Sequence, residues 1–174
     1  MFYMIAHSTR EWKEFVEILK ALRINVLVDI RRFPTSKKFP WFSKENLERE
    51  LSKEGIEYVW LEELGGYREG GYENHTRTEE YSKGIEKLIE LGKNKRVAVM
   101  CAEIKWWKCH RRFVADSLVE RGFEVFHVWD LNRIEKHEYL KYRERKIKCD
   151  KKALRRAKSK EQTGSSQHRH RNLR

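Results

Sequence analysis

Five short apolar runs recur along the first 130 residues, and they carry the branched and aromatic side chains typical of buried β-strands. They cover residues 2–6, 25–30, 57–61, 96–101 and 124–129. Between consecutive runs, apolar residues return at a spacing of three and four positions, which predicts an amphipathic helix in each interval. These helices are expected to start near Thr9, Ser43, Thr78 and Cys109. The order of elements is therefore strand and helix in alternation, closed by a fifth strand.

This alternation predicts an α/β fold, in which an open, largely parallel sheet of about five strands carries helices on both faces. We expect the α/β domain to cover residues 1–135, a basic helical extension to cover residues 136–160 and a disordered tail to cover residues 161–174. The charged stretch that leads into the extension is expected to be helical from Asn132 onward. Residues 64–76, with four glycines, are expected to form a long surface loop.

Composition narrows the class of protein. Charged residues make up 38% of the 174 residues, whereas Gly (9), Pro (2) and Cys (3) are scarce, which excludes collagen-like, low-complexity and disulfide-scaffold proteins. No apolar run approaches the roughly 18 residues of a membrane helix, and the first residues lack the features of a signal peptide. An odd, small number of cysteines fits a reducing cytosol. Abundant Lys and Glu, with no Gln before Gln162, are a bias typical of hyperthermophile proteins.

The net charge of +12 is concentrated at one end of the chain. Residues 141–174 hold 14 of the 39 lysines and arginines but only 3 of the 27 acidic residues, so residues 1–140 are nearly neutral. Such asymmetry predicts a basic arm for nucleic acid or another polyanion. The alternative is a solvated tail that aids solubility and binds polyanions only weakly.

Polar side chains follow three of the predicted strands. They are His7 and Ser8 after the first strand, Asp29, Arg31 and Arg32 at the end of the second, and Cys101 and Glu103 at the end of the fourth. In open parallel sheets the ligand crevice lies beyond the carboxyl ends of the strands. One such group would be explained by helix capping, but three on one edge favour a functional site.

The strongest local signal is Cys101 followed by Cys109 and His110 at a helix start. Either thiol could act as a nucleophile beside His7 or His110, and the helix amides with Arg111 and Arg112 could hold an anion. Cys101 could equally be a small buried residue of the core. A zinc site from the two cysteines and His110 is an alternative, but the spacing is not the usual C-x₂₋₄-C and a second pair is lacking. We therefore expect no metal and no cofactor.

Several known motifs are absent. No glycine-rich phosphate loop and no G-x-G-x-x-G follow the first strand, which argues against nucleotide-triphosphate hydrolysis and dinucleotide redox chemistry. A Cys-x₅-Arg loop would need an arginine at position 107, which is Trp107. Trp106 and Trp107 are expected to be exposed and could stack on bases, or else cover the core. His127, within an apolar strand, is expected to be a core residue.

These segments resemble the family catalogued as domain of unknown function 488. The matching pieces, in order, are residues 5–8, 27–34, 58–61, 64–66, 100–103 and 109–112. Two departures are Ala6, where the family pattern usually has glycine, and residues 104–108, which replace a stretch that usually holds acidic residues or proline. The resemblance implies an α/β domain with these residues clustered, and it supplies no reaction.

From the residues, we expect an enzyme, a hydrolase or transferase, that acts on nucleic acid or nucleotides, with base excision or modification as one chemistry. Arginines would hold phosphate, and Asp29 and Glu103 would orient groups or transfer protons. The expected partner is nucleic acid, DNA before RNA, with no membrane. The alternatives are a non-catalytic nucleic-acid-binding protein and a small-molecule or redox enzyme whose basic tail is incidental.

Overall fold

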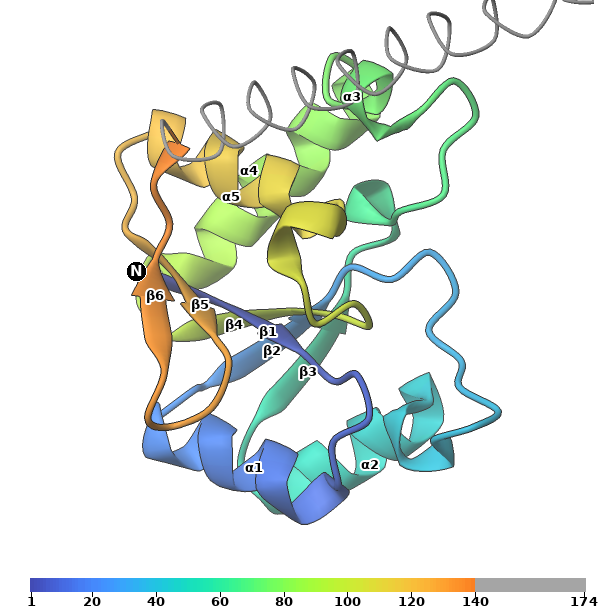
Figure 1. Ribbon diagram of the computed structural model, residues 1–174, viewed down its shortest axis with the longest axis vertical. Coiled ribbons are helices and arrows are strands. Elements are labelled where there is room, and N and C mark those ends of the chain that lie inside the picture. The colour runs from blue at the N-terminus through green and yellow to red at the C-terminus, as the bar shows by residue number, and fades with distance from the viewer. Residues whose placement is uncertain (140–174) are drawn as a thin grey trace, which may run out of the picture. The chain divides into compact units, whose positions relative to one another are not determined.

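The computed structural model describes residues 1–139, of which Met1–His137 form one compact unit (Figure 1). The predicted helical extension and tail lie outside the described residues, apart from the first few positions of the extension. The strands are β1 (Phe2–Ala6), β2 (Val26–Asp29), β3 (Glu57–Trp60), β4 (Val97–Cys101), β5 (Val125–Val128) and β6 (Ile134–Lys136). The α-helices are α1 (Trp12–Ala21), α2 (Lys44–Lys53), α3 (Tyr72–His75), α4 (Glu79–Gly92) and α5 (Arg111–Glu120). Three short 3₁₀ helices are η1 (Pro40–Phe42), η2 (Glu62–Leu64) and η3 (Trp106–Lys108).

The sheet has six strands in the order β3-β2-β4-β1-β5-β6, and it confirms the predicted α/β class. The first five strands in this order are parallel, and β6 pairs antiparallel with β5. Figure 1 shows α1 and α2 on one face of the sheet and α4 and α5 on the other. Loops after neighbouring strands therefore diverge to opposite faces, which is the arrangement that opens a crevice at the carboxyl edge of a parallel sheet.

Two apolar cores lie on the two faces of the sheet, because alternate side chains of each strand point in opposite directions. One core packs Phe2, Met4, Val97 and Val99 against α4 and α5. The other packs Tyr3, Ile5, Ala98 and Met100 against α1 and α2. Each of these strand residues is nearly inaccessible to solvent. This alternation continues past the strand ends and decides on which side each functional side chain emerges.

The expected helix from Asn132 is wrong at its start, because residues 134–136 form β6. Asn132 lies in a hairpin turn, where its backbone N–H donates to the carboxylate of Asp130 at 2.7 Å. The turn is closed by a hydrogen bond from Trp129 N to Arg133 O of 3.0 Å. Asp and Asn stabilise tight turns through such local bonds, and the same residue types also start helices, so the sequence signal was ambiguous.

Two other predictions differ from the structure. The first helix, α1, starts at Trp12 after Glu11, and Thr9 does not cap it. Thr78, in contrast, does cap α4, by accepting a hydrogen bond from Tyr81 N at 3.2 Å. The segment 64–76 is not a free surface loop, since it contains α3 and is fastened by Tyr72, whose hydroxyl donates to Leu64 O at 2.7 Å. Within residues 1–139, no helix is both long and apolar enough to span a bilayer.

Candidate functional site

The ends of β1, β2 and β4 lie side by side at the carboxyl edge of the sheet. Ala6 is paired with Cys101 and Asp29 with Met100 in the strand register. Backbone hydrogen bonds continue one step further, from His7 N to Cys101 O at 3.0 Å and from Ile30 N to Met100 O at 3.0 Å. The polar residues that follow these three strands therefore leave the sheet at the same level.

Side-chain alternation divides these residues into two groups. Cys101 continues the face of Val97 and Val99 and joins Cys109 and His110 near α5; we call these three the thiol–imidazole cluster. Asp29 points to the opposite face, where it joins Arg31 and His7; we call these three the Asp–Arg–His cluster. The two clusters thus lie on opposite sides of the sheet plane, at one edge.

A cavity of about 550 Å³ lies between the two clusters, and we call it the strand-end cavity. Its wall is formed by His7, by residues from the segments 31–36 and 66–67, and by residues 101–103 and 108–110. Two aromatic side chains stand at this wall with most of their surface in solvent, Phe33 (67% exposed) and Tyr67 (92% exposed). The cavity also has cationic groups, Arg32 and Lys108, and the carboxylate of Glu103.

The Asp–Arg–His cluster is built around a buried ion pair. Asp29 is inaccessible to solvent, and Arg31 is 6% exposed. The Asp29 carboxylate accepts from Arg31 Nε at 2.9 Å, from Arg31 Nη2 at 2.6 Å and from the Tyr58 hydroxyl at 2.8 Å. Arg31 Nη2 also donates to Phe42 O at 2.8 Å. Asp29 does not reach the cavity wall, so its place in the structure is that of a residue that positions Arg31.

His7 is held as a neutral ring. Its Nδ1–H donates to the carbonyl of Ser8 at 3.1 Å, which leaves Nε2 to accept from Arg31 Nη1 at 3.3 Å. The ring stacks on Phe42 with centroids 4.6 Å apart. Burial, with the nearby Arg31 charge, lowers the pKa of His7 to about 4, because both disfavour the imidazolium.

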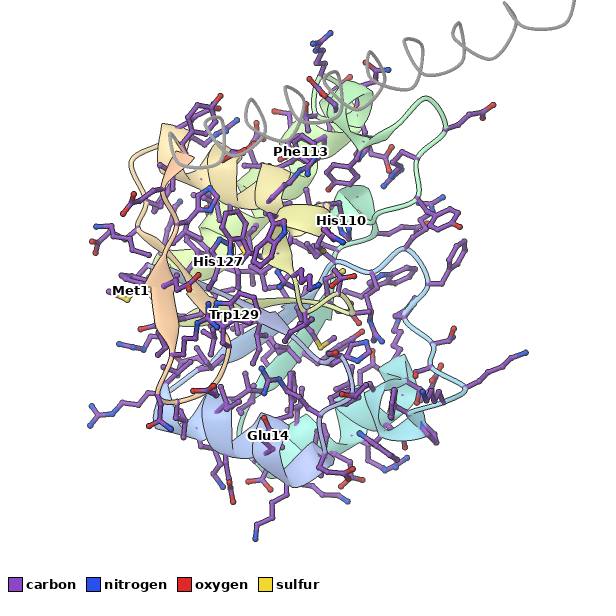
Figure 2. All side chains as sticks on the ribbon, viewed as in Figure 1. Met1, Glu14, His110, Phe113, His127 and Trp129 are labelled. Carbon is purple, nitrogen blue, oxygen red and sulfur yellow. The ribbon has the colours of Figure 1, made fainter. Side chains whose placement is uncertain are left out.

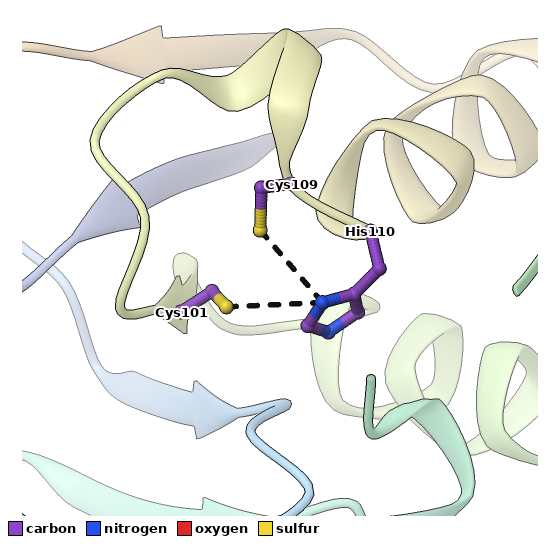
Figure 3. Close-up of side chains that lie close together, drawn as sticks. All are labelled: Cys101, Cys109 and His110. Atoms are coloured by element: carbon purple, nitrogen blue, oxygen red, sulfur yellow. Dashed lines mark hydrogen bonds between the residues drawn. The ribbon is translucent and has the colours of Figure 1, made fainter. Parts of the chain in front are cut away.

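The thiol–imidazole cluster converges on a single nitrogen (Figure 3). The sulfurs of Cys101 and Cys109 each lie 3.8 Å from Nδ1 of His110, and the three potential ligand atoms all lie within 4.8 Å of one another. His110 Nε2 lies 2.8 Å from the carbonyl of Ile30 and must donate to it, because a carbonyl only accepts. Nδ1 therefore carries a lone pair directed at the two sulfurs.

The pKa values of the two thiols shift in opposite directions. The pKa of Cys101 is lowered well below its ordinary value because Cys109 donates a hydrogen bond to its sulfur and His110 lies nearby. The pKa of Cys109 is raised for the converse reason, since losing its proton would break that bond and place two negative charges together in a buried site. Both cysteines are free thiols. The cluster thus offers one sulfur that is readily ionised.

Two consecutive glycines close the cavity against His110. A Cβ on Gly66 would lie 2.7 Å from Nδ1 of His110, and a Cβ on Gly65 would lie 3.0 Å from the backbone of Arg32. Neither position can therefore carry a side chain without displacing the cluster or the loop after β2. Tyr67, the next residue, has a φ of +63°, which is rare for a bulky side chain. Backbone strain of this kind concentrates at functional sites.

Arg111, Trp106 and Ser8 lie outside the strand-end cavity. Arg111 is 2% exposed and donates to the carbonyls of Glu103 (2.6 Å) and Ile104 (3.0 Å), so it fastens the loop after β4 instead of facing a ligand. Trp106, expected to be exposed, is buried and stacks on His127 at 4.1 Å. Ser8 follows the sheet edge, with its N–H bonded to Ala102 O at 3.1 Å.

Of the remaining predicted residues, all but Trp107 line one of two cavities. Arg32, which pairs with Glu62 at 2.9 Å, and Glu103, which accepts from Lys105 N at 2.8 Å, line the strand-end cavity. Arg112 lines a second cavity of about 530 Å³, together with His110. Trp107 lies beside Trp129, with ring centroids 5.7 Å apart, and lines neither cavity.

Sequence reasoning assigned no site role to several residues of the cavity wall, among them Phe33, Tyr67 and Lys108, or to Tyr58, the partner of Asp29. For Tyr67 a signal was present, because an aromatic residue directly after two glycines in a polar segment is hard to explain by packing. His127, which is labelled in Figure 2, was expected in the core and is buried there. It also belongs to a chain of hydrogen bonds. Its Nε2 lies 2.8 Å from His137 Nδ1, and His137 Nε2 lies 2.8 Å from the carboxylate of Asp116.

Comparison with known proteins gives one match. A family model described as "Domain of unknown function DUF488" matches residues 11–118, which include the ends of β2 and β4 and most of α5. Neither the curated proteins nor the solved structures contain a match.

Proposed function

The chain belongs to the family of the domain of unknown function DUF488, and we propose that it is an enzyme that acts on nucleotides or nucleic acid in the strand-end cavity. The observation that carries this proposal is the composition of one cavity wall. Exposed aromatic rings and cations, which suit a base and its phosphate, share the wall with imidazoles, thiols and a carboxylate, which suit catalysis.

Recognition of a base would fall to Phe33 and Tyr67. Both rings are exposed on the cavity wall, where an apolar ring gains little unless a ligand covers it. Stacking of a base on an aromatic side chain is worth about 1–3 kcal/mol and tolerates any base, because each base has a π face. The left-handed backbone at Tyr67 supports the same role, since this conformation disfavours a bulky side chain and is concentrated at functional sites.

Phosphate contact would fall to Arg32 and Lys108. Arg31, the arginine favoured by the sequence, has its charge compensated by Asp29 and most of its donors engaged, so it contributes less. Arg32 shares its charge with a half-exposed Glu62, and Lys108 is exposed. Both can turn toward a phosphate at little cost.

The reacting groups on this wall are His7, Glu103 and the thiol–imidazole cluster. His7 is neutral near pH 7, so it can accept a proton once a substrate displaces Arg31 from Nε2. Glu103 is exposed, and the carboxylate oxygen that does not accept from Lys105 N can orient a ligand hydroxyl or amino group. Chemistry on an extruded base, either its excision or its modification, fits aromatic rings next to a carboxylate.

Calorimetric titration of the full chain with nucleoside monophosphates and with short single-stranded DNA and RNA, repeated across a salt series, tests the proposal. Tyr67→Ala and Phe33→Ala should each weaken binding by about 5- to 150-fold, the equivalent of one lost stacking contact. Leu131→Ala is the matched control, because Leu131 is an exposed apolar residue (48%) that does not line the cavity. Equal affinity in all three variants, with binding lost uniformly as salt rises, would refute the cavity as the binding site.

A non-catalytic nucleic-acid-binding protein is the alternative, and turnover separates the two. Products of base release or base modification should form with the wild-type chain and fall at least tenfold with Glu103→Gln or His7→Gln, while the affinity stays within a factor of about three. If binding depends on Tyr67 but no product forms from any DNA, RNA or nucleotide, the binding protein is the correct interpretation.

A further inference from the structure

We propose that Cys101, Cys109 and His110 bind a zinc ion at the wall of the strand-end cavity. The proposal concerns metal binding alone and does not depend on which substrate enters the cavity. Its basis is the arrangement of three donor atoms that come from two separate elements, the end of β4 and the residues just before α5.

The sulfur–nitrogen distances are close to those of a tetrahedral zinc site. With zinc–sulfur bonds of about 2.3 Å and a zinc–nitrogen bond of about 2.0 Å, tetrahedral geometry requires sulfur and nitrogen to lie about 3.5 Å apart and the two sulfurs about 3.8 Å apart. Both sulfurs lie 3.8 Å from His110 Nδ1, and all three donor atoms fit within 4.8 Å. To bind the ion, the two sulfurs would move toward each other by up to about 1 Å, while the sulfur–nitrogen distances would change by a few tenths of an ångström.

Hydrogen bonding alone does not explain why both sulfurs approach the same nitrogen. Nδ1 has one in-plane lone pair and can accept one S–H, because the proton of the ring is held on Nε2 by the carbonyl of Ile30. A bond between the thiols and one bond to Nδ1 leave the second sulfur–nitrogen contact without a donor. A cation at the centre of the three atoms satisfies all of them at once.

The surroundings also have the form of a metal site. Histidines that bind a metal through one nitrogen usually donate the other N–H to a carbonyl or carboxylate, and His110 does so at 2.8 Å. The backbone N–H of Arg111 donates to the Cys109 sulfur at 3.5 Å. Gly66 leaves room for the His110 ring, which a Cβ would displace.

Zinc is the ion that these ligands select. Thiolate and imidazole together suit Zn²⁺, whereas Mg²⁺ and Ca²⁺ require oxygen ligands. Three protein ligands leave a fourth position, and all three residues line the cavity, so that position faces the space where a ligand would enter. Zinc sites with an open fourth position are typically catalytic, because the ion activates a bound water or polarises a substrate.

Metal analysis of the purified full chain, by mass spectrometry of its elements, tests the proposal. We expect one zinc ion per chain in the wild type and almost none in Cys101→Ser, Cys109→Ser or His110→Ala. The first control is Cys149→Ser, which removes the remaining cysteine and should leave the zinc content unchanged. The second is His168→Ala/His170→Ala, which removes the histidines of the tail and should also leave it unchanged.

Cobalt replacement gives a readout that does not depend on how much protein folds. Co²⁺ bound by two thiolates shows a sulfur-to-metal charge-transfer band whose intensity follows the number of sulfur ligands. Each serine variant should halve the band per bound ion, and His110→Ala should keep the band but weaken the affinity by at least tenfold. Circular dichroism of each variant identifies any that has simply failed to fold.

Three results would overturn the proposal. They are zinc contents far below one per chain in the wild type, zinc that persists in all three ligand variants, and a Cys101–Cys109 disulfide in the freshly isolated protein, which would indicate a redox dithiol. Failure of the proposed function is distinguishable, because it would appear as an unchanged nucleotide affinity in Tyr67→Ala, measured on protein whose zinc content is that of the wild type.

Discussion

The buried ion pair between Asp29 and Arg31 should be a main determinant of stability. Asp29→Asn is the perturbation that tests this. Both carboxylate oxygens accept hydrogen bonds from Arg31, and Tyr58 donates to one of them. Whichever oxygen the amide nitrogen replaces, an N–H group of the new side chain faces an N–H group of Arg31. The positive charge of Arg31 is then left in a buried site without a compensating anion.

The size of the effect follows from burial. Breaking a buried ion pair by removing one partner costs about 3–5 kcal/mol, because the remaining charge is neither hydrated nor paired. Asp29 is 0% exposed and Arg31 is 6% exposed, so water does not replace the lost interaction. For a chain of this size we expect the melting temperature to fall by about 10 °C or more.

A double-mutant cycle in urea at neutral pH separates the pair from the individual residues. Asp29→Asn and Arg31→Met should each be strongly destabilising, and the double variant should be more stable than their sum predicts by about 2 kcal/mol or more. The exposed pair of Lys95 and Glu57 is the control, and its removal should cost at most about 1 kcal/mol.

Two outcomes would refute this reasoning. One is a loss of less than about 1 kcal/mol in Asp29→Asn, with effects of the two substitutions that simply add. The other is full stability combined with a large loss of turnover, which would place Asp29 in catalysis and not in the positioning of Arg31.

Three further predictions follow from the cavity and the cores. Gly66→Ala should displace His110 and abolish zinc binding while the chain stays folded. The control is Gly55→Ala, whose Cβ meets nothing within 4 Å, and which should cost about 1 kcal/mol of stability and leave zinc binding unchanged. Zinc retained by Gly66→Ala would contradict the packing argument. Tyr67→Gly should raise the free energy of unfolding by about 1 kcal/mol, because glycine adopts the left-handed backbone without strain, and it should also weaken nucleotide binding. A variant with the stability and nucleotide affinity of the wild type would refute both the backbone strain and the base stacking at Tyr67. Burial and the nearby Arg31 charge lower the pKa of His7 to about 4, and burial together with His137 lowers the pKa of His127 to about 2. As the pH falls below 6.5, the unfolded chain therefore binds protons at these two rings before the folded chain does. The free energy of unfolding then declines by up to about 1.4 kcal/mol per pH unit for each ring. His7→Gln should therefore reduce the slope of unfolding free energy between pH 6.5 and 5 by about half, and an unchanged slope would show that His7 is not buried as a neutral ring.

Most of the fold could be predicted because its central strands are buried. A strand covered on both faces appears as an uninterrupted apolar run, and β1, β2, β4 and most of β5 are buried in this way. The edge strand β3 is only partly buried, and its branched and aromatic residues made it predictable. The sixth strand escaped because it is a three-residue edge strand with an exposed Ile134, so burial left no pattern on its sequence. Its turn residues, Asp130 and Asn132, carry the same local signal as a helix start.

The candidate site could be predicted only in part. Parallel strands necessarily bring their carboxyl ends to one edge, which located His7, Arg31 and Cys101 together. The approach of Cys109 and His110 to Cys101 could not be predicted from their spacing, since seven residues intervene and the usual zinc motifs are shorter. That loop is folded back by Arg111, whose side chain bonds to carbonyls within it, a long-range contact that no local pattern encodes.

The period of two along a strand also explains why acidic and sulfur groups of the same edge take different roles. Asp29 and Cys101 end neighbouring strands, yet they point to opposite faces of the sheet. On the face of α1 and α2, the carboxylate of Asp29 accepts hydrogen bonds from Tyr58 and Arg31, so its oxygens are engaged within the protein. On the face of α4 and α5, the sulfur of Cys101 lies near the sulfur of Cys109 and Nδ1 of His110, and these are the three atoms that we propose to bind zinc. Substitution of Asp29 should therefore change stability before function, and substitution of Cys101 should change metal content and function before stability.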